Sequence, residues 1–170
     1  ARASVPVPSI IYGSQMIPRV LGAIKQNTNT QVISAGTVRG PVTGAEYIKK
    51  AINAMPSWCK LDGVAVHPYG RGAPGYRGAF APFGSLEDEY RALMGLNLPI
   101  YVTEFGVLDN KDAPVELVAD YLRTALTYSR RFVPPVKSLI WYGWSDVMDN
   151  GYGFVDRNGA VKRAMFDALN

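Results

Sequence analysis

Apolar residues recur along the chain with two alternating periods, one typical of helices and the other of strands. Stretches with an apolar residue at every third or fourth position predict helices over 16–24, 43–55, 85–94, 112–126 and 164–169. Short apolar runs between them predict strands over 30–37, 61–67, 99–105 and 137–144. A helix separates each pair of successive strands, as in a series of βα units. The pattern therefore predicts an α/β fold with a parallel sheet.

Local signals support two of the helix starts. Thr43 and Glu46 have the spacing of a capping box, in which each side chain bonds a free backbone N–H of the first turn. Asp112 can cap the fourth helix, with Pro114 in its first turn. A Gly-, Pro- and Arg-rich loop over 70–84 precedes the third helix, where Ser85 can act as the cap. We therefore expect these helices to begin close to the caps.

Polar and aromatic side chains gather where the predicted strands end. His67 and Tyr69 follow the second strand, Glu104 ends the third, and 144–146 end the fourth. Neither a Gly-x-Gly-x-x-Gly motif nor a phosphate-loop lysine follows any strand, so nothing supports a nucleotide-binding sheet. Clustering at the carboxyl ends of strands is typical of the active-site rim of a TIM barrel. Glu104, a carboxylate after an apolar strand, is either a capped strand end or a group used in chemistry.

Composition limits the alternatives. The 170 residues are 48% hydrophobic, which suits one globular domain over 1–170, and no apolar run approaches the length of a membrane span. The net charge of +4 is scattered, and the basic doublets 49–50 and 130–131 are interpreted as solvated helix surface. We therefore expect no nucleic-acid face. Cys59 is the only cysteine and His67 the only histidine, which excludes an internal disulfide and a Cys/His zinc site.

Three motifs together resemble a known family of enzymes. HPYG at 67–70, IYVTEFGV at 100–107 and LIWYGWSDVMDNGYGFVDRNG at 139–159 resemble the last three strands of TIM-barrel glycoside hydrolases. They are similar to the large retaining clan, clan GH-A-like, that includes cellulases, β-mannanases and β-xylosidases. The resemblance extends from about residue 12 to the end of the chain. It implies a (β/α)8 TIM barrel of which this chain supplies roughly strands 5–8.

The resemblance implies that Glu104 is the catalytic nucleophile, and that Tyr69 donates a hydrogen bond to it. Such a bond would keep the carboxylate ionised and aimed at the sugar. Side-chain alternation predicts one strand face with Ile100, Val102 and Glu104 above the barrel interior, and the opposite face toward the helices. The residues expected on the opposite face are Tyr101, Thr103 and Phe105. The same alternation turns His67 and Tyr69 inward; the alternative is that both are only hydrogen-bonded residues of the rim.

The end of the fourth strand is suited to a sugar, because aromatic faces pack on pyranose rings while polar groups bind hydroxyls. We expect Trp144 to be the platform beneath the cleaved sugar and Tyr142 to share its face. Trp141 is expected to point toward the helices, unless a bulge reverses the alternation. Asp146, Asp149 and Asn150 are expected either to bind hydroxyls or to cap loops. A cleft wall or lid is the function suggested for three residues of the long loop: Arg71, Tyr76 and Arg77.

The chain departs from the family in lacking an Asn-Glu-Pro type stretch, which in the clan holds the acid/base glutamate on strand four. The four other glutamates lie in predicted helices, where none is placed for this function: Glu46, Glu87, Glu89 and Glu116. Four βα units also cannot close a barrel, and they leave open strand edges. We therefore expect the N-terminal half from a second polypeptide, from another part of the protein or from a second copy of this chain.

Two functions follow from these considerations. The first is a retaining glycoside hydrolase acting on a β-linked polysaccharide or oligosaccharide, with Glu104 as nucleophile, without a metal or an organic cofactor. The second is a non-catalytic component of the same fold that binds polysaccharide or serves a structural purpose. Because members of the clan are often exported, we expect a secreted or cell-envelope protein.

Overall fold

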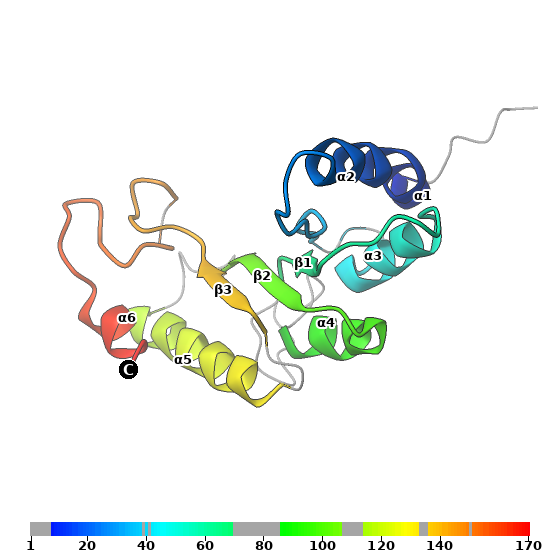
Figure 1. Ribbon diagram of the computed structural model, residues 1–170. Helices are drawn as coiled ribbons and strands as arrows, with labels where there is room; N and C mark the ends of the chain where they lie inside the picture. The colour runs from blue at the N-terminus through cyan, green and yellow to red at the C-terminus, as the bar shows by residue number, and fades with distance from the viewer. Residues whose placement is uncertain are drawn as a thin grey trace, which may run out of the picture.

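The protein is described here by a computed structural model, which covers residues 8–38, 40, 42–69, 86–106, 114–132, 136–149 and 151–170. Helices and strands alternate along most of the chain (Figure 1). In order they are α1 (Pro8–Ile11), the π-helix η1 (Tyr12–Met16), α2 (Ile17–Lys25), α3 (Gly44–Asn53), β1 (Val64–Val66), α4 (Leu86–Leu93), the 3-10 helix η3 (Met94–Leu96), β2 (Ile100–Phe105), α5 (Val115–Arg131), β3 (Ser138–Trp141) and α6 (Arg163–Asp167). The alternation confirms the predicted α/β class.

The start of α3 confirms the predicted cap. The Thr43 side chain accepts a hydrogen bond from the Glu46 backbone N–H at 3.1 Å, which satisfies one of the free donors of the first turn. The helix α5 begins at Val115, directly after Pro114. The caps predicted at Ser85 and Asp112 lie outside the described residues. The first predicted helix is longer than its apolar pattern, because α1, η1 and α2 follow one another without a break from Pro8 to Lys25.

The three strands form a parallel sheet in the order β1-β2-β3, with α4 and α5 in the connections between them. The prediction of a regular strand over 30–37 is wrong. This segment forms only isolated parallel bridges, from Ile33 to Gly63 and from Thr37 to Val66. The two bridges are separated by one more residue on this segment than on its partner. That extra residue breaks the ladder, although the segment still runs beside β1.

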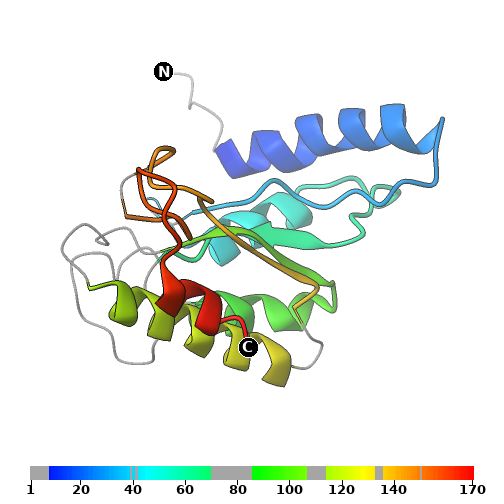
Figure 2. The same ribbon diagram turned by 90° about the vertical axis from the view of Figure 1, so that its left-hand side faces the viewer.

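The helices pack against one another around the strands. Both α1 and η1 contact α3, and α3 in turn contacts α4. Figures 1 and 2 show α4 and α5 on the same side of the sheet, below it, with α1 and α2 at the opposite end of the molecule. The described strands form a three-stranded sheet and no closed barrel. None of the described helices has both the length and the apolar character needed to cross a membrane.

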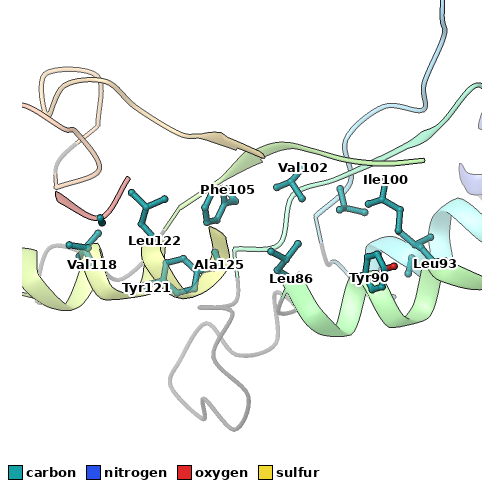
Figure 3. Packing of buried hydrophobic residues seen from close by; sticks show 14 of the residues in the cluster. Leu86, Tyr90, Leu93, Ile100, Val102, Phe105, Val118, Tyr121, Leu122 and Ala125 are labelled. Carbon is teal, nitrogen blue, oxygen red and sulfur yellow. The ribbon is translucent and has the colours of Figure 1, made fainter. Parts of the chain in front are cut away.

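The main core lies between the sheet and the helices α4 and α5 (Figure 3). From β2, Ile100, Val102 and Phe105 project into it, each at most 1% exposed. The helices contribute buried residues to the same cluster: Leu86, Tyr90, Leu93, Val118, Tyr121, Leu122 and Ala125. A smaller cluster beneath α2 consists of Ile17, Leu21, Cys59 and Leu61. The opposite side is buried in β1 but only partly covered along β2 and β3, so the two faces of the sheet differ in character.

The predicted orientation of β2 is wrong in part. Ile100 and Val102 face the helices rather than the opposite side, and Thr103 does not. The reason is an irregularity in the pairing with β3: Val102 pairs with Leu139, whereas Phe105 pairs with Trp141, so β2 has one extra residue in this interval. A bulge of this kind interrupts the strict alternation of side chains. It places Thr103 and Glu104 together on the face away from the helices, which we call the open face.

In the strand β3, the prediction for Trp141 is confirmed. Its ring meets Phe105 edge-on at 5.0 Å and lies 6.3 Å from Tyr121, on the helix side. The neighbouring Ile140 points to the open face and is 53% exposed. The strand ends at Trp141, three residues before its predicted end at Trp144. Residues beyond 141 therefore do not follow strand alternation.

Candidate active site

Three of the predicted site residues meet at the carboxyl ends of β1 and β2. His67 and Tyr69 follow β1, and Glu104 is the next-to-last residue of β2. The Tyr69 hydroxyl donates a hydrogen bond to Glu104 Oε1, and His67 Nδ1 lies 3.8 Å from Glu104 Oε2. The pairing of the two parallel strands explains this meeting, because it brings the ends of both to one edge of the sheet. The arrangement places one group on each oxygen of a single carboxylate.

Tyr69 is buried, and its environment favours the protonated phenol. Burial, together with the hydrogen bond to Glu104 and the charge of that carboxylate, raises the pKa of Tyr69 far above its ordinary value. The phenol therefore stays a donor throughout the range in which proteins are folded. Glu104 in turn acts as the acceptor, and its side chain remains 36% exposed. A carboxylate oriented by a fixed donor and open to solvent on one side can attack a bound electrophile.

His67 is held by a second contact on its other nitrogen. Its Nε2 lies 3.0 Å from Thr103 Oγ1, which is hydrogen-bonding distance. Gly36 lies against the same edge of the ring, and a Cβ added there would come within 2.0 Å of Nε2. Sequence reasoning missed both residues. Alternation had assigned Thr103 to the helix face, and nothing in the local sequence marks the bulge that turns it over.

Tyr142 lies beside this group. Its ring meets that of Tyr69 edge-on at 6.3 Å and that of Tyr152 at 5.2 Å. Tyr152 is also buried, and its ring is so close to Gly106 that a Cβ at that position would lie 2.9 Å from it. Tyr152 was not among the predicted site residues, although it lies in the aromatic and glycine-rich segment that follows β3. The three tyrosines form an aromatic wall next to Glu104.

Trp144 lies in a different environment from Tyr142, so the prediction that the two share a face is wrong. Its indole stacks on Phe154 at 6.0 Å and meets Phe166 edge-on at 5.9 Å. The intervening Gly143 has a φ of +88°, which turns the chain and ends the alternation. The indole is 60% exposed. Among the described ring contacts, none joins Trp144 to the tyrosines near Glu104.

Asp146 caps its loop, one of the two predicted alternatives. Its Oδ1 accepts hydrogen bonds from the Gly153 backbone N–H at 2.8 Å and from Lys162 Nζ at 2.7 Å. The residue is 8% exposed, so this oxygen is committed to the protein. Asp149 belongs to the same loop, where its backbone carbonyl accepts from the N–H of Tyr152. Four other residues named from the sequence lie outside the described part: Arg71, Tyr76, Arg77 and Asn150.

The remaining predicted-helix glutamates are engaged elsewhere or exposed. Glu46 pairs with Lys50 on α3, and Glu87 pairs with Arg91 on α4. The buried Glu89 accepts a hydrogen bond from the Ala45 backbone N–H at the start of α3, at 2.8 Å. Glu116 is exposed in the first turn of α5. Over the described ranges, no cluster of three or more His, Cys, Asp or Glu side chains that could bind a metal is found.

Solved structures of glycoside hydrolases share this fold. A GH128 (subgroup II) endo-β-1,3-glucanase from Sorangium cellulosum superposes with a TM-score of 0.65 at 19% identity, over 90% of this chain and 59% of that one. A second subgroup II enzyme, from Pseudomonas viridiflava, superposes with a TM-score of 0.63 at 19% identity, over 92% of this chain and 60% of that one. The GH39 enzyme from Xanthomonas axonopodis pv. citri superposes with a TM-score of 0.59 at 17% identity, over 94% of this chain and 35% of that one. The chain thus spans about three fifths of the length of these glucanases.

Sequence comparison gives a family match over most of the chain. No protein with a curated description is similar at a significant level. The family described as "Glycosyl hydrolase catalytic core" matches residues 13–165, which include β1, β2 and β3 and the three residues that meet at Glu104. This chain therefore belongs to the glycosyl hydrolase catalytic core family.

Proposed function

We propose that this chain supplies the nucleophile of a retaining β-glycoside hydrolase, and that the nucleophile is Glu104. The observation that supports this most directly is the hydrogen bond from Tyr69 to Glu104 Oε1 at the carboxyl ends of two parallel strands. With Oε1 held by the phenol, Oε2 is the oxygen available for attack. The carboxyl ends of barrel strands are also where active sites of TIM-barrel enzymes lie.

In the proposed reaction, a Glu104 carboxylate oxygen forms a bond to the anomeric carbon while the bond to the leaving oxygen breaks. A second carboxylic acid, about 5 to 5.5 Å from the nucleophile, gives its proton to that oxygen. Water, deprotonated by the same second group, then attacks the anomeric carbon and releases Glu104 and the sugar. The product keeps its original anomeric configuration.

We propose that the second carboxylic acid comes from outside the described residues. The glutamates considered above have other partners or lie exposed on a helix, and the chain spans about three fifths of its glucanase neighbours. We propose that this chain forms strands 5–8 of a (β/α)8 barrel, and that an N-terminal half supplies strands 1–4 and the acid/base. The exposed Ile140 on the open face of β3 is consistent with a missing cover.

We propose a β-1,3-glucan as the substrate, because the two GH128 subgroup II neighbours reported above are described as endo-β-1,3-glucanases. In this proposal Tyr142 contacts the sugar next to Glu104, since its ring already borders Tyr69. Trp144, with one face on Phe154 and most of its surface exposed, offers a platform further along the chain of sugars. Asp146 is left out of sugar binding, because its carboxylate holds the loop.

Replacement of Glu104 tests the proposal. In protein that contains the whole barrel, as one polypeptide or as this chain with its complementing half, Glu104→Gln should lower hydrolysis of a soluble β-1,3-glucan by at least about 10³-fold. Glucan binding should remain within a few-fold of the original. The matched control is Glu46→Gln, because Glu46 is an exposed glutamate of α3 paired only with Lys50 among the described contacts. Turnover by Glu104→Gln that equals the control would refute the assignment.

A non-catalytic glycan-binding protein is the second candidate. The observation in its favour is the exposed indole of Trp144, together with the fact that no group of three or more His, Cys, Asp or Glu side chains that could bind a metal is found at Glu104 in the described residues. Denaturing and native mass spectrometry of the purified protein separate the two candidates. A companion polypeptide or a longer chain with an Asn-Glu stretch favours the hydrolase; a lone chain that binds glucan without hydrolysing it favours the binding protein.

A further inference from the structure

The imidazole of His67 lies between Thr103 and Glu104, with one ring nitrogen facing each. We propose that the Glu104 carboxylate fixes the tautomer of His67 with its proton on Nδ1, and that Thr103 is a positioning residue whose hydroxyl donates to the free Nε2 and holds the ring in this orientation. The Nε2 to Thr103 Oγ1 distance is 3.0 Å and the Nδ1 to Glu104 Oε2 distance is 3.8 Å. The tautomer itself is independent of the proposed function, whereas its effect on hydrolysis rests on that function.

Electrostatics decides between the two neutral tautomers. A neutral imidazole has one N–H donor and one lone-pair acceptor. Glu104 is held as an acceptor by the Tyr69 phenol, so its oxygens present lone pairs to their surroundings. A proton on Nε2 would leave the Nδ1 lone pair facing the carboxylate, which is repulsive. A proton on Nδ1 gives an attractive charge–dipole contact, and Nε2 then accepts the hydroxyl proton of Thr103.

Two backbone features bring these groups together. The bulge between Val102 and Phe105 puts Thr103 on the same side of the strand as Glu104, where regular alternation would have separated them. Gly36 leaves room for the Nε2 edge of the ring, since a Cβ there would lie 2.0 Å from that atom. The hydroxyl of Thr103 is therefore in position to form a hydrogen bond with Nε2. No other hydrogen bond to this nitrogen is found among the described residues.

The tautomer can be read directly, because His67 is the only histidine of the chain. With ¹⁵N-histidine in this chain, long-range proton–nitrogen NMR distinguishes a protonated from an unprotonated ring nitrogen without any assignment. The spectra are recorded at moderately alkaline pH. Where the chain folds only with the rest of its barrel, that part is supplied unlabelled. We expect a pyrrole-type Nδ1 and a pyridine-type Nε2.

Three variants test the function of Thr103. Thr103→Val keeps the shape but removes the hydroxyl, so the proton should stay on Nδ1 while the pyridine-type Nε2 resonance moves to the position of a nitrogen without a hydrogen bond. Thr103→Ser retains the hydroxyl and should keep the original spectrum. Thr127→Val is the matched control, because the Thr127 hydroxyl bonds only the backbone of its own helix at Arg123 among the described contacts. A proton on Nε2 in the unmodified protein, or an unchanged spectrum for Thr103→Val, would overturn the proposal.

Kinetics with a β-1,3-glucan then test the catalytic consequence. Thr103→Val should lower kcat by about tenfold with little change in KM, because one hydrogen bond near the nucleophile is lost. Thr103→Ser should recover most of that loss. A changed Nε2 resonance with an unchanged kcat in Thr103→Val would overturn the positioning function. If the unmodified protein does not hydrolyse glycans, the proposed function fails, while the NMR result still decides the tautomer of His67 and whether Thr103 donates to Nε2.

Discussion

The two faces of β2 differ in how completely this chain covers them. On the helix face, Ile100, Val102 and Phe105 are at most 1% exposed and pack on α4 and α5. On the open face, the Glu104 side chain is 36% exposed and Ile140 of the adjacent strand is 53% exposed. The difference teaches that the packing of β2 and β3 within this chain comes mainly from one side of the sheet. The groups proposed for chemistry lie on the other side.

The largest effect is expected on the helix face. Phe105→Ala should lower the free energy of unfolding by about 3 to 5 kcal/mol, because it removes a fully buried ring that contacts Tyr121 and Trp141. Urea denaturation measures the loss. The matched variant on the open face is Ile140→Ala, which in this chain alone should cost less than about 1 kcal/mol. Equal losses for the two variants would contradict the asymmetry.

The second prediction tests whether the complementing half of the barrel covers the open face. When the complementing half of the barrel is present, Ile140→Ala should cost about 2 to 4 kcal/mol, because the side chain would then be buried. The same substitution in this chain alone supplies the comparison. Thermal unfolding of the assembled protein and of the single chain gives both values. An equally small loss in each would mean that the proposed second half does not cover this part of β3.

The third effect concerns chemistry on the open face. Tyr69→Phe removes the hydrogen bond to Glu104 and should lower kcat/KM for a β-1,3-glucan by about 10- to 100-fold, the value of a hydrogen bond to a charged group. Because the pKa of Tyr69 is raised, the phenol does not lose its proton at moderately alkaline pH. The tyrosine should therefore add no alkaline limb to the pH–rate profile. Tyr128→Phe, on the outer helix α5, is the control.

The smallest effect is expected at a residue outside the two faces of β2. Asp62 accepts hydrogen bonds from Lys25 Nζ at 2.8 Å and the Val32 N–H at 2.7 Å, and these hold its pKa below the ordinary value. A lowered folded pKa gives stability that is present above about pH 3.9 and is lost as the pH falls through the folded pKa. The unmodified chain should thus lose up to about 1 kcal/mol more than Asp62→Asn between pH 6 and pH 2.

Thermal unfolding at several pH values measures this difference. Asp120→Asn is the control, because Asp120 forms a more exposed pair with Arg123. An acid-dependent loss of stability that is the same in Asp62→Asn and in the unmodified chain would contradict the prediction. Since Asp62 precedes β1 rather than lying within a face of the sheet, the effect should be independent of the variants described above.

The order of the elements could be predicted from the sequence, because it depends on local periodicity and local caps. Thr43 with Glu46 is an example, since both partners lie within one turn. The meeting of Tyr69 with Glu104 was expected from the family resemblance, and the structure has this contact. The retaining mechanism and the half-barrel arrangement remain predictions. What could be foreseen depended on neighbours in the chain or on a shared motif.

The departures have a common physical origin in backbone irregularities. One extra residue in β2 turned Thr103 and Val102 to faces opposite to those expected. The positive φ of Gly143 separated Trp144 from Tyr142. Asp146 holds its loop because it accepts a hydrogen bond from Lys162, which is sixteen positions away in the chain. Nothing in the sequence near either residue indicates this pairing. Each of these is fixed by tertiary contacts, which a period of two or 3.6 residues does not encode.

The loop that follows β3 is tied together by the chain itself. Lys162 and Gly153 bind one oxygen of Asp146, and Val155 forms bridges with both Ser145 and Val161. The conformational entropy of this segment is therefore lost when the protein folds and not when a glycan arrives. A sugar that reaches the indole of Trp144 would meet a rigid surface, and its binding should proceed without a slow ordering step of the loop.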